Sequence, residues 1–282
     1  MDEQKSTLLS GKTAKDENFP VGSFLLPARL RPHVAAYYRF ARTADDIADH
    51  PTLPSADKVA GLKAMGEALK TGIATTAESE AAIPLKASLA LTGVDPRHAL
   101  DLLIAFTRDS VRNRTLSWDD LIEYCRYSAM PVGRFLLDLH GEDPKAVWPA
   151  SDALCAALQI LNHLQDLQKD YRDLDRAYPP EDWMAAEGAR FEDLAGPAFT
   201  PALARVVRRM LDATGRLIDE ARPLPARIRH RGMRMEAAVI VALCGRLHRR
   251  LERQDPLAGR VKLTKPDFLG CGLVGVVRGF FG

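Results

Sequence analysis

The stretch YYRFARTADDIADH, residues 37–50, decides the fold and much of the chemistry of this chain. The run from His33 to His50 contains no Gly or Pro and predicts a helix. Asp45 and Asp49 are four residues apart, so they lie on one helix face. Like charges at this spacing repel by roughly 0.2–0.5 kcal/mol. A divalent cation is the simplest partner that would offset this repulsion.

The same helix face continues toward the N-terminus with Arg42 and Tyr38. An aromatic ring, a guanidinium group and two carboxylates therefore share one line along the predicted helix.

A second informative stretch is QILNHLQDLQKDYRDLDR, residues 159–176. Its amide and carboxylate side chains recur at helical spacing on one face: Gln159, Asn162, Asp166 and Asp170. A small set of hard oxygen ligands suits Mg²⁺, which keeps several waters and shares phosphate oxygens. For either stretch alone, a solvated and charged helix face is the alternative.

Taken together, the two stretches predict more than either does alone. Two helices with such carboxylate pairs can face each other across a bundle, hold several Mg²⁺ ions and stabilise a departing diphosphate. A di-iron bundle is the competing use of paired carboxylates, but it needs Glu-x-x-His. The sequence contains no Glu with a His three residues later.

Composition narrows the class of protein. The 282 residues include 39 Lys and Arg against 37 Asp and Glu, and 46% are hydrophobic. These values indicate a globular chain and argue against a dedicated nucleic-acid binder. The four cysteines form no CxxC pair, which argues against a structural zinc site or a disulfide framework and fits a reducing cytoplasm.

Helical patterns dominate the rest of the chain, and no alternating strand pattern occurs. Further helices are predicted over residues 56–70, 97–111, 117–130, 150–172, 201–222 and 233–253. Residues 173–201 contain four prolines and predict a long loop with one short helix at most. We therefore expect one all-α domain.

Two features leave alternatives open. The last fifteen residues, FLGCGLVGVVRGFFG, predict either a segment packed on the domain or a surface anchor that does not span the bilayer. Residues 201–260 hold 14 Arg against six acidic residues, a net charge of +8. This excess predicts either a solvated helix face or attraction to an anionic ligand or membrane. The first twenty residues show no signal peptide.

These motifs resemble the squalene/phytoene synthase family of head-to-head prenyl synthases, over residues 17–183. In this chain, DDIAD at Asp45–Asp49 is similar to the family's first aspartate motif. The residues Asn162, Asp166 and Asp170 are similar to its second motif, Asn-x-x-x-Asp-x-x-x-Asp. Between them, YCRYSAMPVGR (residues 124–134) is similar to a third family segment, and RAYPP (residues 176–180) to a fourth. Four ordered motifs are far more specific than one aspartate pair.

The resemblance implies a single-domain isoprenoid synthase helical bundle with a central active-site cavity over residues 17–267. Residues 1–16 would be a flexible N-terminus, and residues 268–282 an apolar tail. It implies three Mg²⁺ ions held by Asp45, Asp49, Asn162, Asp166 and Asp170. It implies substrate contacts at Asn18, Phe19, Tyr38, Arg42, Gln159, Gln165, Arg172 and Arg176. It implies catalytic roles for Tyr38, Arg42, Tyr124 and Tyr127, although core packing is the alternative for the last two.

Three departures from the family pattern narrow the reaction. Asn18-Phe19 stands where Ser-Phe is common, Gln165 replaces an arginine, and no tyrosine follows Tyr178. The motifs are most similar to the bacterial branch that ionises presqualene diphosphate and quenches the rearranged cation with water to give hydroxysqualene. No NADPH is expected for that reaction. The loss of a guanidinium at position 165 suits a substrate with one diphosphate.

Several alternatives remain. A relative that forms presqualene diphosphate, squalene or phytoene would act on farnesyl diphosphate as a prenyltransferase, rather than as a carbon–oxygen lyase. A class I terpene cyclase would lack the YCRYSAMPVGR segment. A non-catalytic protein that holds lipid diphosphates is disfavoured by the complete set of expected metal ligands. We expect a cytoplasmic protein, peripheral at the inner membrane face, in contact with other squalene-pathway enzymes and not with nucleic acid.

Overall fold

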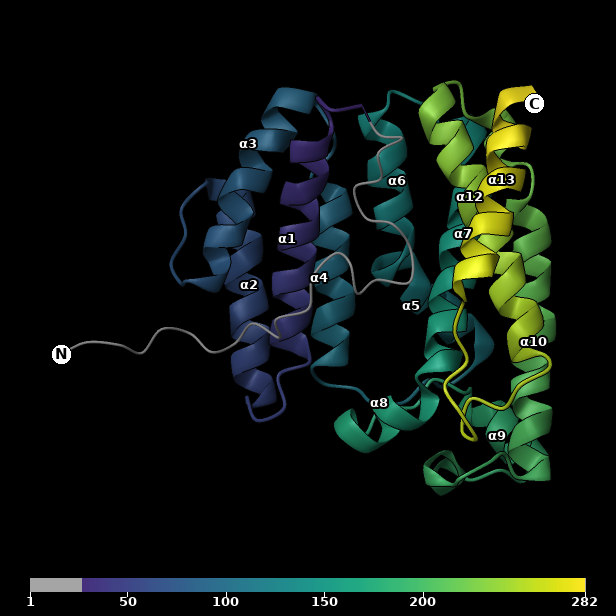
Figure 1. The fold of residues 1–282 in the computed structure, drawn as a ribbon. Coiled ribbons are helices and arrows are strands. Elements are labelled where there is room, and N and C mark those ends of the chain that lie inside the picture. Colours follow the sequence, from purple (N-terminus) through teal and green to yellow (C-terminus); the bar gives the residue numbers. More distant parts are fainter. Residues whose placement is uncertain (1–26, 282) are drawn as a thin grey trace. The chain divides into compact units, whose positions relative to one another are not determined.

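The computed structural model describes residues 27–281, and for residues 274–281 it describes the backbone alone. Within that range the regular elements are helices, joined by turns and loops, and the β pairing is limited to one isolated bridge between Arg114 and Ala177. The predicted all-α class is therefore confirmed. The chain divides into two compact units, Met1–Arg112 (unit 1) and Asn113–Gly282 (unit 2) (Figure 1). The single domain over residues 17–267 stays a prediction.

Unit 1 is built around its first helix. Its elements are α1 (Arg31–Ala48), α2 (Ser55–Thr71), a short 3₁₀ helix (Glu78–Ala81), α3 (Ala82–Thr92) and α4 (Arg97–Asp109). Helix α1 packs against α2, α3 and α4. The Tyr37 hydroxyl donates to the carbonyl of His98 at 3.0 Å, and Nδ1 of His33 lies 2.8 Å from Oγ of Ser88. These contacts fix which face of α1 is buried and leave the Arg42 face for polar groups.

Unit 2 is built around α7. Its elements are α5 (Trp118–Ser128), α6 (Met130–Leu139), α7 (Pro144–Gln165), α8 (Leu167–Leu174), α9 (Glu181–Glu187), a 3₁₀ helix (Phe191–Ala195), α10 (Pro201–Ala221), α11 (Leu224–Arg227), α12 (Arg231–Leu251) and α13 (Lys265–Phe281). Helix α7 packs against α6, α10 and α12. Ile160, Leu161 and Leu164 on it are fully buried.

The glycine of the YCRYSAMPVGR segment has a packing role. A Cβ atom at Gly133 would lie 2.5 Å from Oγ of Ser151 and 2.6 Å from Sγ of Cys155 on α7. Helix α6 can approach α7 this closely only because position 133 has no side chain. The segment therefore fixes the position of the α5–α6 connection relative to α7.

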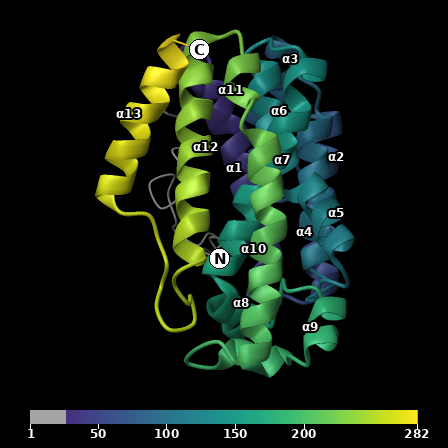
Figure 2. The same ribbon diagram turned by 90° about the vertical axis from the view of Figure 1, so that its right-hand side faces the viewer.

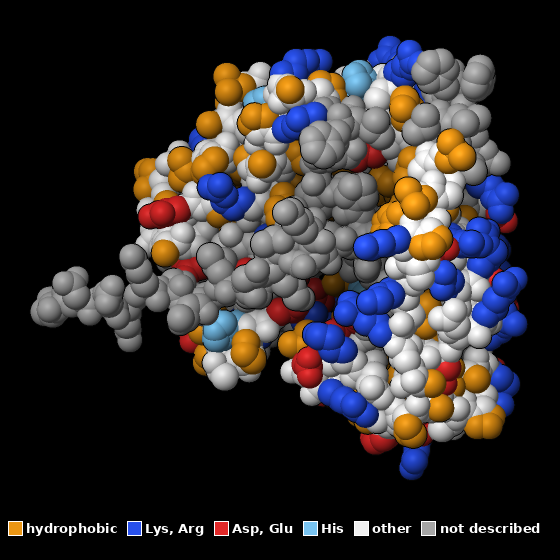
Figure 3. Space-filling model, in the orientation of Figure 1, with side chains coloured by type: hydrophobic (Ala, Val, Ile, Leu, Met, Phe, Trp, Pro, Cys, Tyr) orange, Lys and Arg blue, Asp and Glu red, His pale blue; other side chains and the backbone are white. Residues whose placement is uncertain are grey.

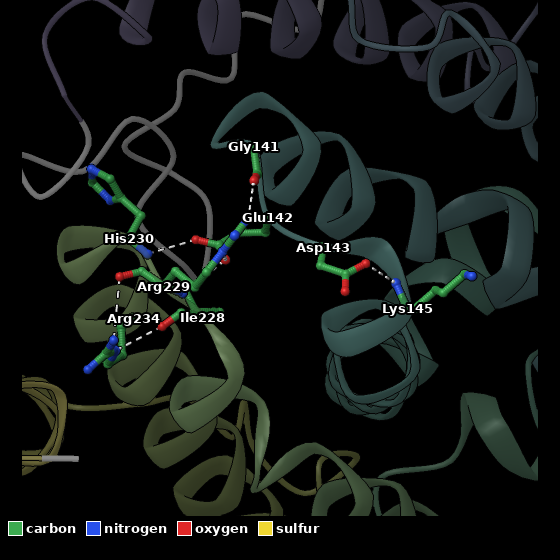
Figure 4. A network of polar contacts seen from close by, with 8 residues as sticks. All are labelled: Gly141, Glu142, Asp143, Lys145, Ile228, Arg229, His230 and Arg234. Atoms are coloured by element: carbon green, nitrogen blue, oxygen red, sulfur yellow. Dashed lines mark hydrogen bonds and ion pairs between the residues drawn. The ribbon is translucent and has the colours of Figure 1, made fainter.

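A buried carboxylate joins two turns of unit 2 (Figure 4). Glu142, between α6 and α7, accepts from the backbone N–H groups of Arg229 and His230 at 2.9 and 2.7 Å. The His230 ring then caps α12 by accepting from the N–H of Met233 at 3.2 Å. Arg229 donates in return to the carbonyl of Gly141 at 2.7 Å. These bonds fix where α12 starts relative to α7.

Some expected boundaries were wrong. The helix expected over residues 150–172 is interrupted at Asp166, whose backbone (φ −103°, ψ 10°) ends α7 and begins α8. The pattern did not predict α3 or α6. Helix α6 was not predicted because Pro131 and Gly133 interrupt the helical sequence pattern, although a proline in the first turn is compatible with a helix. The region 173–201 holds α9 and one 3₁₀ helix, one more helical element than the single short helix expected.

The C-terminal segment forms helix α13, which packs along α12 (Figure 2). Leu269 and Leu273 on α13 are 75% and 70% exposed. Among the described residues, no helix combines the length and the apolar character that crossing a bilayer would require. The segment therefore packs on unit 2 in part, and contact with a membrane stays a prediction.

Candidate active site

The first aspartate motif carries its own cation. On α1 the guanidinium of Arg42 bridges two carboxylates, with Nη1 2.8 Å from Asp45 and Nη2 2.7 Å from Asp46. The Asp46 side chain is only 5% exposed, whereas that of Asp45 is 35% exposed. Charge-assisted bonds of this kind are short and directional. Arg42 therefore holds the two acids in place from within the same helix.

Negative charge is crowded around Asp45. Burial of the Asp45 carboxylate and, next, the charge of Asp49 raise the pKa of Asp45 to about 7. The charge of Arg42 acts in the opposite direction. Asp46 and Asp109, at the end of α4, raise the pKa further. A cation beside Asp45 and Asp49 would relieve this repulsion. The oxygen-only donor set and the excess negative charge fit Mg²⁺.

The other two predicted residues of α1 flank this group. Asp49 follows the last helical residue, and its N–H donates to the carbonyl of Asp45 at 2.9 Å. Tyr38 lies one turn before Arg42 and is half-buried. Tyr38, Arg42 and Asp45 therefore follow one another at one-turn spacing on α1, and Asp49 continues the row directly after the helix end.

The second motif lies at the junction of α7 and α8. Despite the interruption at Asp166, the one-turn spacing persists. The N–H of Asp166 donates to the carbonyl of Asn162 at 3.0 Å, and the N–H of Asp170 to that of Asp166 at 2.9 Å. All three side chains are half-buried. The predicted oxygen stripe is therefore present, although it is divided between two helices.

Asp170 is held by a tyrosine that the spacing of the carboxylates did not predict as part of the site. The hydroxyl of Tyr178 donates to Oδ2 of Asp170 at 2.8 Å. Burial and the charge of Asp166 raise the pKa of Asp170, while the Tyr178 hydrogen bond lowers it. This bond fixes Oδ2 of Asp170, while Oδ1 faces the ammonium group of Lys169 at 3.8 Å.

The Tyr178 ring is in turn stacked on His163, with ring centroids 3.6 Å apart and planes 4° from parallel. His163 is 4% exposed. Burial, helped by the charge of Arg176, lowers its pKa to about 3. The imidazole is therefore neutral near pH 7, and its Nε2 lies 2.9 Å from the side-chain nitrogen of Gln159. Tyr124 flanks the same ring at 5.8 Å.

His163 and Tyr178 thus link Gln159 to Asp170 through one buried stack. Sequence reasoning missed both residues as site residues, although Tyr178 stands in the RAYPP motif and His163 directly follows Asn162. The available signal was the adjacency of each to a motif residue. The contact between them depends on a loop and could not be read from helical spacing.

That loop is fixed by the segment before α5. The N–H of Ala177 donates to the carbonyl of Asn113 at 2.9 Å, and Arg114 forms an ion pair with Asp175 at 2.7 Å. Trp118 and Trp183 stack beyond it, with centroids 5.4 Å apart. The backbone around residues 113–118 therefore positions Tyr178 against His163.

The remaining predicted residues have varied surroundings. Gln165 is buried, and its amide donates to the carbonyl of Val261 at 2.6 Å. Arg172 is exposed and donates to the carbonyl of Ala195 at 2.6 Å. Tyr127 and Arg176 are half-buried. Asn18 and Phe19 lie outside the described residues, and their roles stay predictions.

Neither motif is a complete metal site by itself. In the part of the chain that the structure describes, no group of three or more His, Cys, Asp or Glu side chains could hold a metal ion. Each carboxylate set would therefore need oxygens from elsewhere, such as those of a diphosphate. The meeting of the two sets on one ligand stays a prediction.

Comparison with known proteins places the chain in a family. Residues 12–267 match the family model described as squalene/phytoene synthase. A hydroxysqualene synthase from Rhodopseudomonas palustris is 48% identical over 94% of this chain and 89% of its own. A hydroxysqualene synthase from Zymomonas mobilis is 42% identical over 98% and 92%.

Solved structures agree with this placement. The squalene synthase HpnC from Alicyclobacillus acidocaldarius matches with a TM-score of 0.73 and 30% identity, over 86% of this chain and 90% of that one. A dehydrosqualene synthase in complex with a ligand matches with a TM-score of 0.77 at 18% identity, which supports the fold alone. The family model, the relatives and the motifs agree. The chain therefore belongs to the squalene/phytoene synthase family of enzymes, whose substrates are isoprenoid diphosphates.

Proposed function

We propose that the chain converts presqualene diphosphate into hydroxysqualene. The observation that carries this proposal is the agreement among three relatives from Rhodopseudomonas palustris, Sinorhizobium fredii and Zymomonas mobilis. They are 42–48% identical over at least 90% of this chain, and each is named hydroxysqualene synthase. Phytoene synthases are also relatives, but at 26–32% identity.

The reaction is a carbon–oxygen lysis followed by hydration. The bond between the cyclopropylcarbinyl carbon and the diphosphate oxygen breaks, and its electron pair leaves with the diphosphate. The cyclopropylcarbinyl cation rearranges, a water oxygen forms the new carbon–oxygen bond, and one proton is released. No electron donor enters this balance, so no NADPH is required.

Residues on α1 and on α7–α8 would together assist ionisation of the substrate. Asp45 and Asp49, with Asn162, Asp166 and Asp170, would hold Mg²⁺; the number of ions, three, comes from the family resemblance. When bound, Mg²⁺ neutralises the charge of the diphosphate and assists its departure. Arg42 holds Asp45 in place, and its charge would also attract the diphosphate.

Two features of unit 2 support a substrate with one diphosphate and a cationic intermediate. Gln165 supplies no positive charge, and its amide already bonds to Val261. The rings of Tyr124 and Tyr178 lie beside a neutral His163. Aromatic faces can stabilise a nearby cation without adding a charge that would capture it.

The direct test is incubation of the purified chain with presqualene diphosphate, with and without Mg²⁺ and with and without NADPH, followed by product identification. We expect hydroxysqualene whenever Mg²⁺ is present, irrespective of NADPH, and none in EDTA. Farnesyl diphosphate alone should be a poor substrate. Coupling of two farnesyl diphosphates would contradict the interpretation of Gln165.

Squalene is the second candidate product, because the structural relative from Alicyclobacillus acidocaldarius is named a squalene synthase. In this case the cation would take a hydride from NADPH instead of an oxygen from water. Squalene formed only in the NADPH arm of the same experiment would favour this function.

The proposed location is cytoplasmic, peripheral at the inner face of the membrane and close to other squalene-pathway enzymes. The exposed Leu269 and Leu273 of α13 support membrane contact. Deletion of residues 268–282 should lower vesicle binding and leave the melting temperature nearly unchanged. A large loss of stability with unchanged vesicle binding would assign the segment to packing alone.

A further inference from the structure

The C-terminal part of α12 carries a pocket lined by positive side chains. Arg246, Arg249, Arg250 and Arg253, with Gln254, surround a surface cavity of about 300 Å³. Arg246, Arg249 and Arg250 are three to four residues apart and share one face of α12, and Arg253 follows two residues after the helix end. Lys and Arg side chains are frequent over unit 2 in the space-filling view (Figure 3). None of the residues around the cavity is apolar or acidic.

Two of the four arginines are already fixed by a carboxylate from α13. Asp267 is 3% exposed and binds Arg246 at 2.7 Å and Arg250 at 2.6 Å. The Thr264 backbone N–H and hydroxyl donate to the same carboxylate, each at 2.8 Å. Burial alone would raise the pKa of Asp267, but these bonds hold it well below its usual range. Asp267 is therefore ionised near neutral pH and contributes one negative charge against four positive ones.

The other two arginines, Arg249 and Arg253, are exposed and form no ion pair with any residue that the structure describes. The acids next to them in sequence are engaged elsewhere. Glu252 faces Arg208 at 3.5 Å and His248 at 3.7 Å, and Asp255 accepts from the N–H groups of Phe199 and Leu257. The pocket therefore keeps a formal charge of about +3.

The helix macrodipole accounts for part of this arrangement. Basic residues stabilise the last turn of a helix by roughly 0.3–1 kcal/mol each. Helix α12 ends at Leu251, so this effect favours Arg249 and Arg250. It does not account for Arg253 beyond the helix end, nor for a cavity between the side chains. Arginines four residues apart repel one another unless an anion lies between them.

We propose that this pocket is a second anion site, built from other residues than the aspartate motifs, that binds a phosphate or diphosphate group through Arg249 and Arg253. The planar guanidinium fork matches phosphate oxygens and donates two bonds at once. A volume of about 300 Å³ is at the lower limit for small-molecule pockets, which span roughly 300–1,000 Å³. The pocket therefore fits an anionic head group and excludes an entire isoprenoid chain.

Such a phosphate group can come from two sources. One is a free diphosphate, which the proposed reaction releases near the protein. The other is the head group of an anionic lipid, because α13 starts at the pocket and exposes Leu269 and Leu273. The chemistry of recognition is the same for both, and two binding experiments distinguish them.

The test uses the full chain and the double variant Arg249→Gln/Arg253→Gln. Its control is Arg216→Gln/Arg227→Gln, which removes the same charge from exposed positions on α10 and α11. Inorganic diphosphate is titrated calorimetrically in EDTA, so that metal-dependent binding is absent. Vesicles of phosphatidylcholine with and without phosphatidylglycerol are used for cosedimentation. Melting temperatures show that each variant is folded.

We expect at least a tenfold loss of affinity in the pocket variant and less than a twofold change in the control. A loss confined to the calorimetric arm identifies free diphosphate, and one confined to phosphatidylglycerol vesicles identifies a lipid head group. Equal binding by the wild type and the pocket variant in both arms would overturn the proposal. So would equal losses in the two variants, which would show that only total charge matters. Absence of wild-type binding in both arms would also overturn it.

Discussion

The two aspartate motifs differ in how their acids are held. On α1 (Arg31–Ala48), Asp45 and Asp46 share Arg42, a charged partner within the same uninterrupted helix. At the α7–α8 junction, Asp170 is held by the neutral hydroxyl of Tyr178, which comes from a loop and stacks on His163. Two motifs with similar spacing therefore have unlike supports. Spacing predicts where carboxylates lie, but it does not predict what orients them.

This difference has electrostatic consequences. In the first motif, burial and then the charge of Asp49 raise the pKa of Asp45 to about 7, and the positive charge of Arg42 partly offsets this rise. In the second, a buried and neutral imidazole adds packing without charge. The first motif should therefore respond to changes in charge, and the second to changes in hydrogen bonding and shape.

The largest expected effect comes from deleting one carboxylate in either motif. Asp45→Asn or Asp166→Asn should lower turnover of presqualene diphosphate roughly 100- to 1,000-fold, about 2.7–4 kcal/mol of barrier, because each removes a proposed Mg²⁺ ligand. Steady-state assays measure the loss, and circular dichroism should show an unchanged fold. Asp173→Asn, an exposed acid on α8, is the matched control and should retain activity. Unchanged turnover in both motif variants would contradict the proposal that these carboxylates bind Mg²⁺.

A smaller effect is expected from the neutral support of the second motif. Tyr178→Phe keeps the stack on His163 and removes the bond to Asp170. Loss of such an outer partner typically costs roughly 10- to 100-fold in activity or metal affinity. We expect weaker Mg²⁺ activation, seen as a higher Mg²⁺ concentration for half-maximal rate. Tyr171→Phe on α8 is the control. If both variants match the wild type, the Tyr178 contact does not support the site.

The smallest expected effect concerns stability against pH in the metal-free protein. His163 has a folded pKa of about 3, below the ordinary value of 6.5. Between these two pKa values the unfolded chain binds one proton more at this residue than the folded chain does. The contribution of the neutral His163 to the unfolding free energy is therefore fully present above pH 6.5 and is lost as the pH falls toward 3. Between pH 7 and pH 5.5 this amounts to about 1 kcal/mol of the unfolding free energy. Denaturant unfolding of wild type and His163→Phe at both values measures it.

The first motif should show the opposite sign. The folded pKa of Asp45 is raised from 3.8 to about 7. Here the folded form binds the extra proton, so stability falls as the pH rises through this window. Asp45→Asn should flatten that fall, whereas His163→Phe should flatten the loss in acid. The same sign of pH dependence for both variants would break the comparison between the two motifs.

Much of the fold could be predicted from the sequence where the pattern was uninterrupted. Helix α1 lies within two residues of the expected run at each end, because residues 33–50 contain no Gly or Pro that would interrupt the helical pattern. Helix α6 was missed because Pro131 and Gly133 resemble helix breakers. The structure shows that one occupies the first turn and the other allows contact with α7. These roles depend on neighbours that a local pattern does not contain.

For the candidate site, the sequence likewise predicted only what helical spacing determines. The polar residues of α1 and α7–α8 lie where helical spacing places them within each unit. The break at Asp166 has no Gly or Pro to mark it. The stack of His163 on Tyr178 depends on the loop fixed by Asn113 and Arg114, about sixty residues earlier in the chain. Contacts of this kind are set by tertiary packing.

The most direct test of the account is the origin of the product's oxygen. Presqualene diphosphate is converted with Mg²⁺ and no reductant in ¹⁸O-labelled water, and the product is analysed by mass spectrometry. We expect hydroxysqualene whose hydroxyl carries the label, because solvent water attacks the rearranged cation. A hydroxyl group without the label, or squalene formed only after NADPH is added, would contradict it.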